Sequence, residues 1–315
     1  MSPKRDVIVV GSANVDISVH APTLPRPGET VFGNGSTIGV GGKGANQAVA
    51  SACCSAFTRF IARVGADAFG QMVRDGLADH RVNIEDVESI EGAATGLATI
   101  SVEDSGQNSI VVVPGANELF GPSDLDAVRT LIRDAAVVVA QCEIQMETVY
   151  RTVELAAEYG ALLILNPAPF RGLDLSRIAG RTTYLIPNAT EASQLTGMAV
   201  ESVEQAMRCA DALKARGISC VIITLGAEGC VVVDEQPARH IAAPRVAAID
   251  TTGAGDAFVG CLAASIATDR SRDESIHRAI VYSALSTTRR GAQASYFGST
   301  EFERAWTRRF ELQYG

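Results

Sequence analysis

The sequence predicts an α/β fold in which a doubly wound, mainly parallel sheet is flanked by helices and carries a small β-sheet lid. Short apolar strand segments alternate with helical patterns along most of the 315 residues, and repeated βα units of this kind build parallel sheets with right-handed crossovers. Residues 162–165 are apolar at every position and residues 221–225 nearly so, as expected of strands covered on both faces. Two β-rich stretches, at about 15–40 and 95–115, break the alternation and form the predicted lid.

The elements follow one another as in a single domain. Strands are expected near residues 7–12, 60–64, 137–141, 162–166, 184–187 and 221–225. Helices are expected near residues 45–55, 70–79, 125–134, 146–159, 191–196, 203–216 and 257–267. Within the lid, residues 95–104 and 108–113 are expected to pair as a hairpin, and prolines punctuate residues 17–38. Because no linker or repeat interrupts this order, residues 1–315 are predicted to be one domain whose lid covers a ligand.

The composition argues against several classes of protein. Apolar residues make up 47% of the chain, which indicates a large core, and no apolar stretch is long enough to span a bilayer, so no membrane partner is expected. The formal net charge of −9, without a basic tract, argues against a nucleic-acid partner. The seven cysteines form no Cys-x-x-Cys pair, which indicates reduced thiols and a cytoplasmic protein, with an organelle such as the peroxisome left open.

Residues 250–260, Asp-Thr-Thr-Gly-Ala-Gly-Asp-Ala-Phe-Val-Gly, carry the strongest functional signal. The glycines free the backbone to curl before an apolar helix, and a helix N-terminus is a ready anion site. The amides expected to converge there are those of Gly253, Ala254, Gly255 and Asp256. The Asp256 carboxylate beside this site would take a proton from a hydroxyl that attacks a phosphoryl group. The alternative is an aspartate that only caps the helix.

A second glycine-rich element precedes the helix expected near residues 45–55. It contains the spacing Gly39-x-Gly41-x-x-Gly44, but it does not close the first βα unit as a dinucleotide-binding loop would. It is not a Walker loop either, because Lys43 is followed by glycine. The element brings Lys43, Asn46 and backbone amides to one place, which suits a polyhydroxylated ligand. The alternative is a glycine-rich helix start with a solvated lysine.

Acidic and amide side chains follow two of the expected strands. Asn14 and Asp16 come after the first strand, at the edge where α/β sheets bind ligands, and an amide with a carboxylate can grip vicinal hydroxyls. Glu143 ends the strand near 137–141 at the same edge. The alternatives are an Asx turn for Asn14 and Asp16, and the first-turn acid of the next helix for Glu143.

Three further segments suit a nucleotide and its ions. Residues 224–229 close a buried strand with two glycines and offer a flat backbone ledge. Asn188 and Glu191 could hold hydrated magnesium, or could equally well start a helix. Residues 288–295 are expected to end a helix with Gly291 as its cap. Carbonyl groups there, with Asp250 nearby, could coordinate a monovalent cation, although ordinary capping suffices.

Together these elements resemble the ribokinase family of carbohydrate kinases over nearly the whole chain. The diagnostic stretches are Gly-Gly-Lys-Gly-Ala-Asn-Gln-Ala at 41–48 and Asp-Thr-Thr-Gly-Ala-Gly-Asp at 250–256. Shorter motifs fall in the family's order at residues 14–16, 27–30, 166–169, 188–191 and 288–295. The resemblance implies a ribokinase-like fold.

The resemblance also implies roles for individual residues, with Asp256 as the catalytic base beside Gly253, Ala254 and Gly255. Sugar-binding positions are matched by Asn14, Asp16, Gly41, Gly42, Lys43, Gly44, Asn46, Glu143 and Asp256. ATP-binding positions are matched by Asn188, Thr224, Leu225, Gly226, Ala227, Glu228, Gly229 and Gly255, while Ile280 stands where the family usually carries Asn or His against adenine. Potassium positions are matched by Asp250, Thr252, Ser286, Arg289, Gly291 and Ser295, and hydrated magnesium by Asn188 and Glu191.

The activity implied by the resemblance is ATP-dependent phosphorylation of D-ribose at O5 to give D-ribose 5-phosphate. Mg²⁺ is expected with ATP, and K⁺ as a monovalent activator. The alternatives are a kinase for another small sugar or a nucleoside, and a non-catalytic regulator that binds a sugar or nucleotide. Because related kinases pair through the lid, a homodimer through the β-lid is expected.

Overall fold

The computed structural model describes residues 6–314 and is built around a nine-stranded, mostly parallel sheet. Residues 1–5 and 315 of the predicted domain lie outside the described residues. The strand order is β13-β12-β11-β10-β9-β8-β1-β4-β5, and β12 and β13 pair antiparallel to their neighbours. The strands are β1 (Asp6–Val10), β4 (Phe57–Gly65), β5 (Val87–Ile90), β8 (Val137–Gln141), β9 (Leu162–Asn166), β10 (Tyr184–Leu185), β11 (Cys220–Thr224), β12 (Cys230–Val233) and β13 (Arg239–Ile241).

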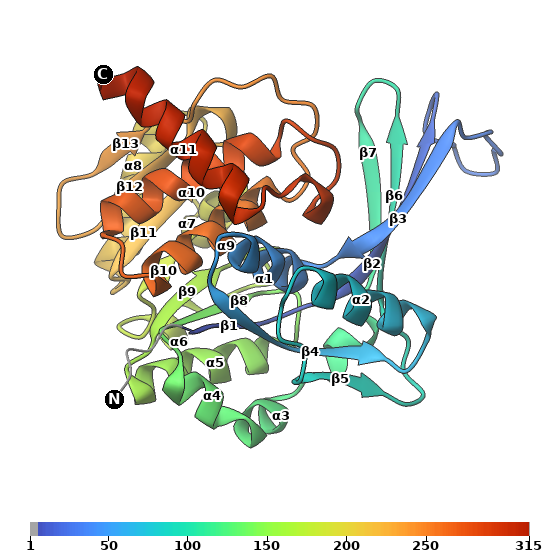
Figure 1. Ribbon diagram of the computed structural model, residues 1–315, viewed down its shortest axis with the longest axis horizontal. Helices are drawn as coiled ribbons and strands as arrows, with labels where there is room; N and C mark the ends of the chain where they lie inside the picture. The colour runs from blue at the N-terminus through green and yellow to red at the C-terminus, as the bar shows by residue number, and fades with distance from the viewer. Residues whose placement is uncertain (1–5, 315) are drawn as a thin grey trace.

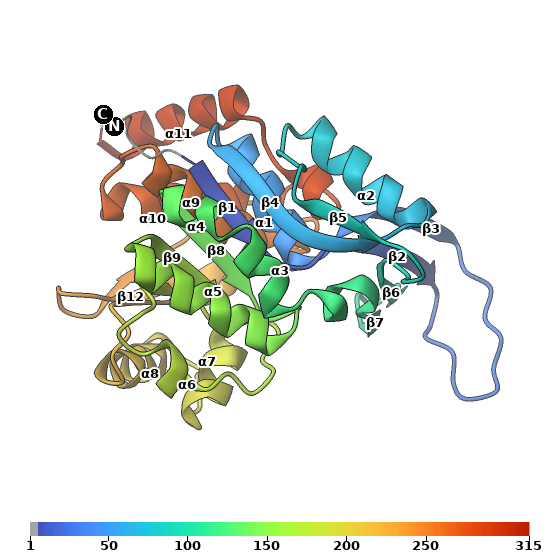
Figure 2. The ribbon, with the colours of Figure 1, turned by 90° about the horizontal axis from the view of Figure 1, so that it is seen from below.

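Helices cover both faces of this sheet, as Figures 1 and 2 show from two sides. One layer contains α1 (Lys43–Cys53), α2 (Ala68–Asp79), α9 (Ala254–Ala267), α10 (Arg272–Ser286) and α11 (Ser299–Tyr314). The other contains α3 (Pro122–Ala127), α4 (Arg129–Asp134), α5 (Met146–Tyr159), α6 (Leu175–Ile178), α7 (Ala189–Thr196) and α8 (Val203–Ala215). Successive β1 residues point into opposite cores, Val7 and Val9 into one and Ile8 and Val10 into the other.

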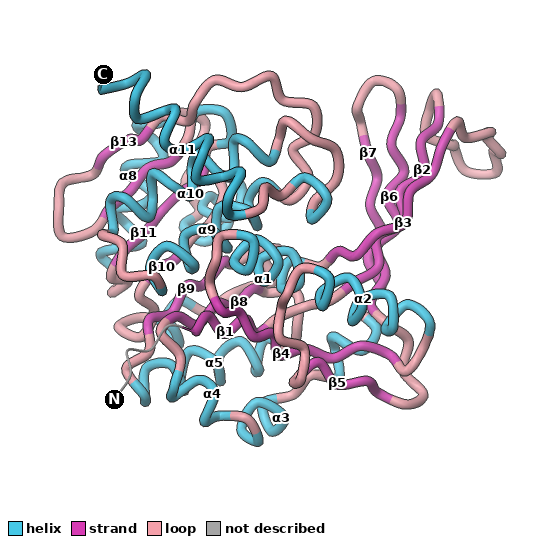
Figure 3. Tube along the Cα trace, in the orientation of Figure 1, coloured by secondary structure: helices cyan, strands magenta, loops and turns pink. Residues whose placement is uncertain are grey.

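A four-stranded sheet in the order β3-β2-β6-β7 projects from the edge of the larger one (Figure 3). Its strands are β2 (Asn14–Ala21), β3 (Gly35–Gly41), β6 (Gly96–Glu103) and β7 (Asn108–Val113). β2 pairs parallel to β6, whereas the β2–β3 and β6–β7 pairs are antiparallel. Apolar side chains stay open to solvent on it, including Val111 with 61% of its surface exposed and Ile38 with 56%.

The predicted elements differ from the structure in several places, and helices α6 and α11 were not predicted. The helix expected near 125–134 is two helices, α3 and α4, interrupted at Val128 with ψ of 15°. The strands β5, β12 and β13 were not predicted, and β5 is short with two exposed polar residues. Residues 288–295 do not end a helix, because α10 stops at Ser286 and Gly291 lies in the loop beyond it with φ of 84°.

The catalytic loop expected from the sequence sits where helices α1 and α9 pack together. α9 is apolar all round and buried along most of its length, as a helix enclosed by neighbours must be. A Cβ on Gly260 would lie 2.5 Å from Ala50 Cβ and 2.6 Å from the Gln47 carbonyl oxygen. Glycine there lets the two helices approach closely.

No helix among the described residues is long and apolar enough to cross a membrane.

Candidate active site

The polar residues of the site gather at the carboxyl edge of the large sheet. The chain leaves β1 toward β4 and β5 on one side and toward β8 through β13 on the other, so the order reverses at β1. Ligands of α/β sheets bind outside such a reversal. Asn166 and Thr224 end strands there, and Ser12, Glu143 and Asn188 follow strands.

Asp256 lies in the first turn of α9 and is 6% exposed. The N-cap of α9 is Gly253, in a left-handed conformation, so the alternative of Asp256 as a capping residue is wrong. Of the four expected amides, that of Ala254 donates to the Thr251 carbonyl oxygen at 3.2 Å. The first-turn amides of Gly255 and Asp256 lie at the helix end, where the helix itself provides them no acceptor.

Both oxygens of the Asp256 carboxylate accept hydrogen bonds from neighbouring residues of α1. Asn46 Nδ2 donates to Oδ2 at 3.0 Å and Gln47 Nε2 donates to Oδ1 at 2.9 Å. Burial raises the pKa of Asp256, while Lys43 and these two amides lower it. The carboxylate is therefore fixed in orientation and is made more basic than an exposed one.

Lys43 lies among four carboxylates. The pKa of Lys43 is raised, chiefly by the charge of Asp256, and Glu143, Glu191 and Asp16 act in the same direction. Burial, together with Glu143 and Asp256, raises the pKa of Asp16 to about 6. A Cβ on Gly41 would lie 2.1 Å from the Asp16 carboxylate, so glycine on β3 makes room for that side chain. These charges act strongly on one another because burial prevents water from screening them.

Glu143 joins the loop after β1 to the start of α1. It accepts from Ser12 Oγ at 2.6 Å and from the Lys43 backbone N–H at 3.0 Å. It precedes Gln145, the N-cap of α5, so the first-turn acid of that helix is Glu147 instead. Helix α1 begins at Lys43, two residues earlier than expected, with Gly42 as its N-cap at φ of 87°.

Asn14 is held by a residue that the sequence did not single out. Asn14 and Asp16 lie in strand β2, so the Asx-turn alternative is wrong. Asn117 Nδ2 donates to Asn14 Oδ1 at 2.8 Å, and Asn117 Oδ1 accepts from the Ala13 N–H at 2.9 Å. The Asn14 side chain is therefore held through its oxygen, and its NH₂ group carries two further donors.

Two adjoining pockets extend from Asp256 across the sheet edge. The pocket at Asp256 has a volume of about 120 Å³, and it is lined by Lys43, Asn166, Ala168, Ile186, Asn188, Glu191, Thr224, Thr251, Gly253, Ala254, Gly255, Asp256 and Val259. The second, of about 250 Å³, shares Asn188 and Thr224 with it and is also lined by Leu225, Gly226 and Glu228. Residues from the predicted sugar-binding, anion-binding and nucleotide-binding segments therefore line adjoining pockets.

Comparison with known proteins identifies the family. The model of the pfkB family of carbohydrate kinases matches residues 4–297. The chain is 35% identical over 298 residues to a deoxyribokinase of Salmonella typhi, covering 94% of this chain and 97% of that one. It is 37% identical over 294 residues to a ribokinase of Mus musculus, covering 92% and 91%.

The chain belongs to the pfkB family of carbohydrate kinases. A solved structure of Arabidopsis thaliana ribokinase complexed with ribose and ATP superimposes on the kinase with a TM-score of 0.87. The two share 30% identity over 96% of this chain and 98% of the other. The family and the ribokinase-like fold predicted from the motifs are confirmed.

The magnesium candidates of the kinase have a structural role as well. Asn188 Oδ1 accepts from the Glu191 N–H, and Glu191 Oε2 accepts from the Asn188 N–H, each at 2.9 Å. This reciprocal pair is a capping box for α7. Both residues also line the pocket at Asp256, and burial raises the pKa of Glu191. The expected contact with hydrated magnesium stays a prediction.

Two of the potassium candidates, Thr252 and Gly291, contact a third, Asp250. Its carboxylate accepts from Thr252 N–H and Oγ at 2.9 and 2.6 Å and from the Gly291 N–H at 2.8 Å, so it joins the two segments. These hydrogen bonds outweigh burial and lower the pKa of Asp250. The Arg289 side chain instead pairs with Glu301 and stacks on Phe297. Ser286 and Ser295 are two further candidates. Their hydroxyl groups donate to the carbonyl oxygens of Ser283 and Ala292.

The predicted adenine contact lies away from the pockets at the sheet edge. Ile280 is 5% exposed and packs in the core, and it lines neither pocket at the sheet edge, so its contact with adenine stays a prediction.

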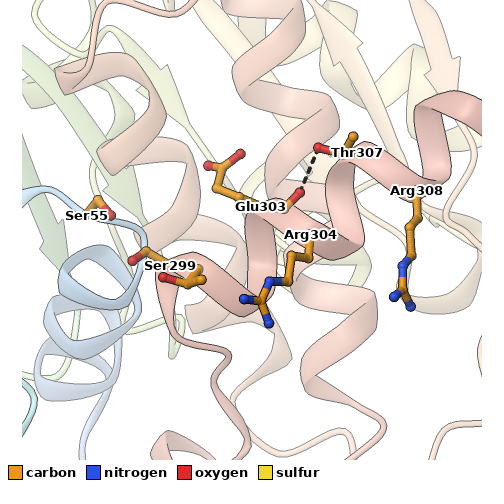
Figure 4. Close-up of a pocket in the computed structure, with 7 residues that line it drawn as sticks. Ser55, Ser299, Glu303, Arg304, Thr307 and Arg308 are labelled. Atoms are coloured by element: carbon orange, nitrogen blue, oxygen red, sulfur yellow. Dashed lines mark hydrogen bonds between the residues drawn. The ribbon is translucent and has the colours of Figure 1, made fainter.

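A hollow of about 600 Å³ lies beside α11, where Arg304 and Arg308 project (Figure 4). None of its lining residues was predicted as a site residue, and neither Asp256 nor the glycine-rich loops reach it.

The raised pKa of Asp16 predicts how substitution of this residue changes the free energy of unfolding as the pH varies. Its pKa in the folded kinase is about 6, against about 4 in an unfolded chain, so holding it ionised opposes folding above pH 6. The Asp16→Asn variant should then be more stable than wild type by about 1–3 kcal/mol at pH 7–8, and this gain should shrink as the pH falls from 6 to 4.

Thermal and urea unfolding across this pH range would measure the difference. The matched control is Asp211→Asn, at an exposed position on α8, which should show no such trend. A gain for Asp16→Asn that is constant with pH would contradict the assigned pKa shift.

Proposed function

We propose that this kinase transfers the γ-phosphoryl group of ATP to O5 of D-ribose. The observation that carries the proposal is the buried Asp256 carboxylate at the start of α9, which adjoins the Lys43, Asp16 and Glu143 cluster on one side and the Asn188 pocket on the other. The similarity to ribokinases of Mus musculus and Arabidopsis thaliana supports ribose as the sugar.

In the proposed reaction Asp256 accepts the proton of the O5 hydroxyl as O5 attacks the γ-phosphorus. The O5–phosphorus bond forms, the bond between the γ-phosphorus and the bridging oxygen breaks, and ADP leaves with that electron pair. The amides of Gly255 and Asp256 at the α9 N-terminus stabilise charge on the transferring group, aided by the helix dipole. The four-stranded sheet would act as a lid that excludes water and limits hydrolysis of ATP.

The remaining contacts divide between the two substrates. Asp16, Lys43 and the Asn14 amide are proposed to hold ribose hydroxyl groups, and residues 224–229 are proposed to support the nucleotide. Glu191 and Asn188 would hold hydrated magnesium, for which the pocket offers oxygen ligands. Bound with ATP, magnesium neutralises phosphate charge.

A second sugar has a specific observation in its favour. The deoxyribokinase of Salmonella typhi matches over 94% of this chain at 35% identity, so 2-deoxyribose is the alternative substrate. ADP release should be measured with ribose, 2-deoxyribose, fructose and adenosine, and the position of the phosphate determined by NMR. The proposal requires the highest kcat/KM with ribose and a 5-phosphate product. A higher value for 2-deoxyribose would establish the alternative, and turnover of adenosine alone would contradict both.

Replacing the proposed base should remove turnover but leave binding. Asp256→Asn should lower kcat about 10²- to 10⁴-fold, while calorimetry finds ribose and ATP affinities close to wild type. Asp211→Asn serves as the control for the substitution itself. A variant that keeps more than about a tenth of wild-type kcat would show that Asp256 is not the base.

Activation by K⁺ is proposed from Asp250, which joins the Thr252 and Gly291 segments beside the α9 N-terminus. A large, weakly hydrated ion fits carbonyl oxygens better than magnesium does, and it would order the loop that carries Gly253–Gly255. Exchanging K⁺ for tetramethylammonium at constant ionic strength should lower kcat several-fold, with smaller effects on KM. Equal rates in both salts would mean that this segment is structural only.

We further propose a homodimer formed through the four-stranded sheet. Val111 and Ile38 are each more than half exposed, and the strand register places both on the same face of the sheet. An exposed apolar patch of this kind marks a site of contact with a partner. Sedimentation velocity should give twice the mass of one chain, and Val111→Asp should reduce it to one. Val246→Asp, at an exposed apolar position outside the sheet, is the control. A wild type that sediments as a monomer contradicts the proposal.

A further inference from the structure

Gln47 contacts the proposed base, yet it has no part in the reaction outlined above. It lies on α1 and is completely buried. Its Nε2 donates to Asp256 Oδ1 at 2.9 Å and to Asn166 Oδ1 at 3.1 Å, so both of its N–H bonds are used. Its Oε1 accepts from Gln141 Nε2 at 2.7 Å. Gln141 is also completely buried, at the end of β8.

These hydrogen bonds allow Gln47 only one amide orientation. Asn166 Nδ2 donates to the Ile186 carbonyl oxygen at 2.7 Å, so the oxygen of Asn166 must face Gln47. If the Gln47 amide were reversed, its oxygen would face two acceptors, Asp256 Oδ1 and Asn166 Oδ1, at hydrogen-bond distance. The chain of amides therefore holds an N–H bond on Asp256.

We propose that Gln47, itself held by Gln141, is a positioning residue that fixes the orientation and the charge state of Asp256 for proton acceptance. The inference rests on the proposed function, in which Asp256 is the base. The second oxygen of Asp256 is held in a parallel way, since Gln293 Nε2 donates to Asn46 Oδ1 at 3.0 Å and Asn46 donates to Asp256. Asn46 is also a proposed sugar contact, so Gln47 offers the cleaner test.

The charge state follows from what surrounds the carboxylate. Burial favours the protonated acid, and the hydrogen bonds from Gln47 and Asn46 favour the carboxylate. The charged groups that act on Asp256 from the adjacent elements are Lys43 on α1, Asp16 on β2, Glu143 after β8 and Glu191 on α7, with the neutral phenol of Tyr296 beyond the α9 N-terminus. Removing one donor while these groups stay in place should leave a larger fraction of Asp256 protonated near neutral pH.

The test compares pH profiles of kcat and kcat/KM for wild type, Gln47→Met and Gln141→Met. Methionine has nearly the same volume as glutamine but no N–H donor. The acidic limb should move upward by about one pH unit in Gln47→Met, because hydrogen bonds to charged groups contribute on that scale. Well below the pKa, on the acidic limb, kcat at a given pH should fall by up to about tenfold, with KM for ATP unchanged. Gln141→Met, which does not touch Asp256, should shift the limb the same way by less.

Gln71→Met, at an exposed position on α2, is the matched control and should superimpose on wild type. A Gln47→Met profile whose acidic limb stays in place overturns the inference, and so does a fall in kcat without movement of the limb, which would mark a merely structural role. Should Gln47→Met fail to fold in a thermal unfolding assay, the Gln141→Met limb decides. A wild type without pentose kinase activity contradicts the proposed function, whereas an active wild type with unmoved limbs contradicts only this inference.

Discussion

The close packing of α1 against α9 is the contact on which the site depends. The N-termini of both helices lie at the carboxyl edge of the sheet, and one carries Lys43, Asn46 and Gln47 while the other carries Asp256. Their side chains meet at 2.9 and 3.0 Å only because Gly260, one turn beyond Asp256, lets the two backbones approach. A larger residue there would push α1 outward, and the anion-binding end of α9 would lose its lysine and both amides together.

The same packing concentrates charge in a buried space. Asp16, Glu143 and Asp256 lie around Lys43, and burial raises the pKa of both Asp16 and Asp256. A buried carboxylate is destabilised unless donors surround it. A ligand rich in hydroxyl groups supplies such donors, so electrostatics favour a polyol over an apolar molecule in this position. The preference for a polyol over an apolar molecule thus comes from these charged side chains and needs no change in the fold.

The sequence predicted best those features that depend on neighbouring residues. The bounds of β8, β9 and α5 agree with the structure because continuous apolar runs and helical periodicity are local patterns. Asp256 was proposed as a base because glycines precede an apolar helix, and its position at the start of that helix agrees with the structure. Gln47, Gln141 and Asn166 were given no role, since their contacts join residues 94 to 209 positions apart. The available signals were the motifs at 41–48 and 166–169, which contain Gln47 and Asn166, and a glutamine, Gln141, that ends an apolar strand. The loop at Gly291 likewise depends on a distant residue, since its N–H donates to Asp250, 41 positions earlier.

Strand β2 belongs to the four-stranded sheet, yet it starts four residues after β1 ends, so its first residues are tethered to the rigid core. Its eight residues extend about 26 Å from this root. A rotation of the projecting sheet by about 10° would therefore carry its far end through roughly 4–5 Å, while Asn14, at the pivot, would hardly move. A rotation of this size would open or close the site while leaving the hydrogen bond between Asn117 and Asn14 in place.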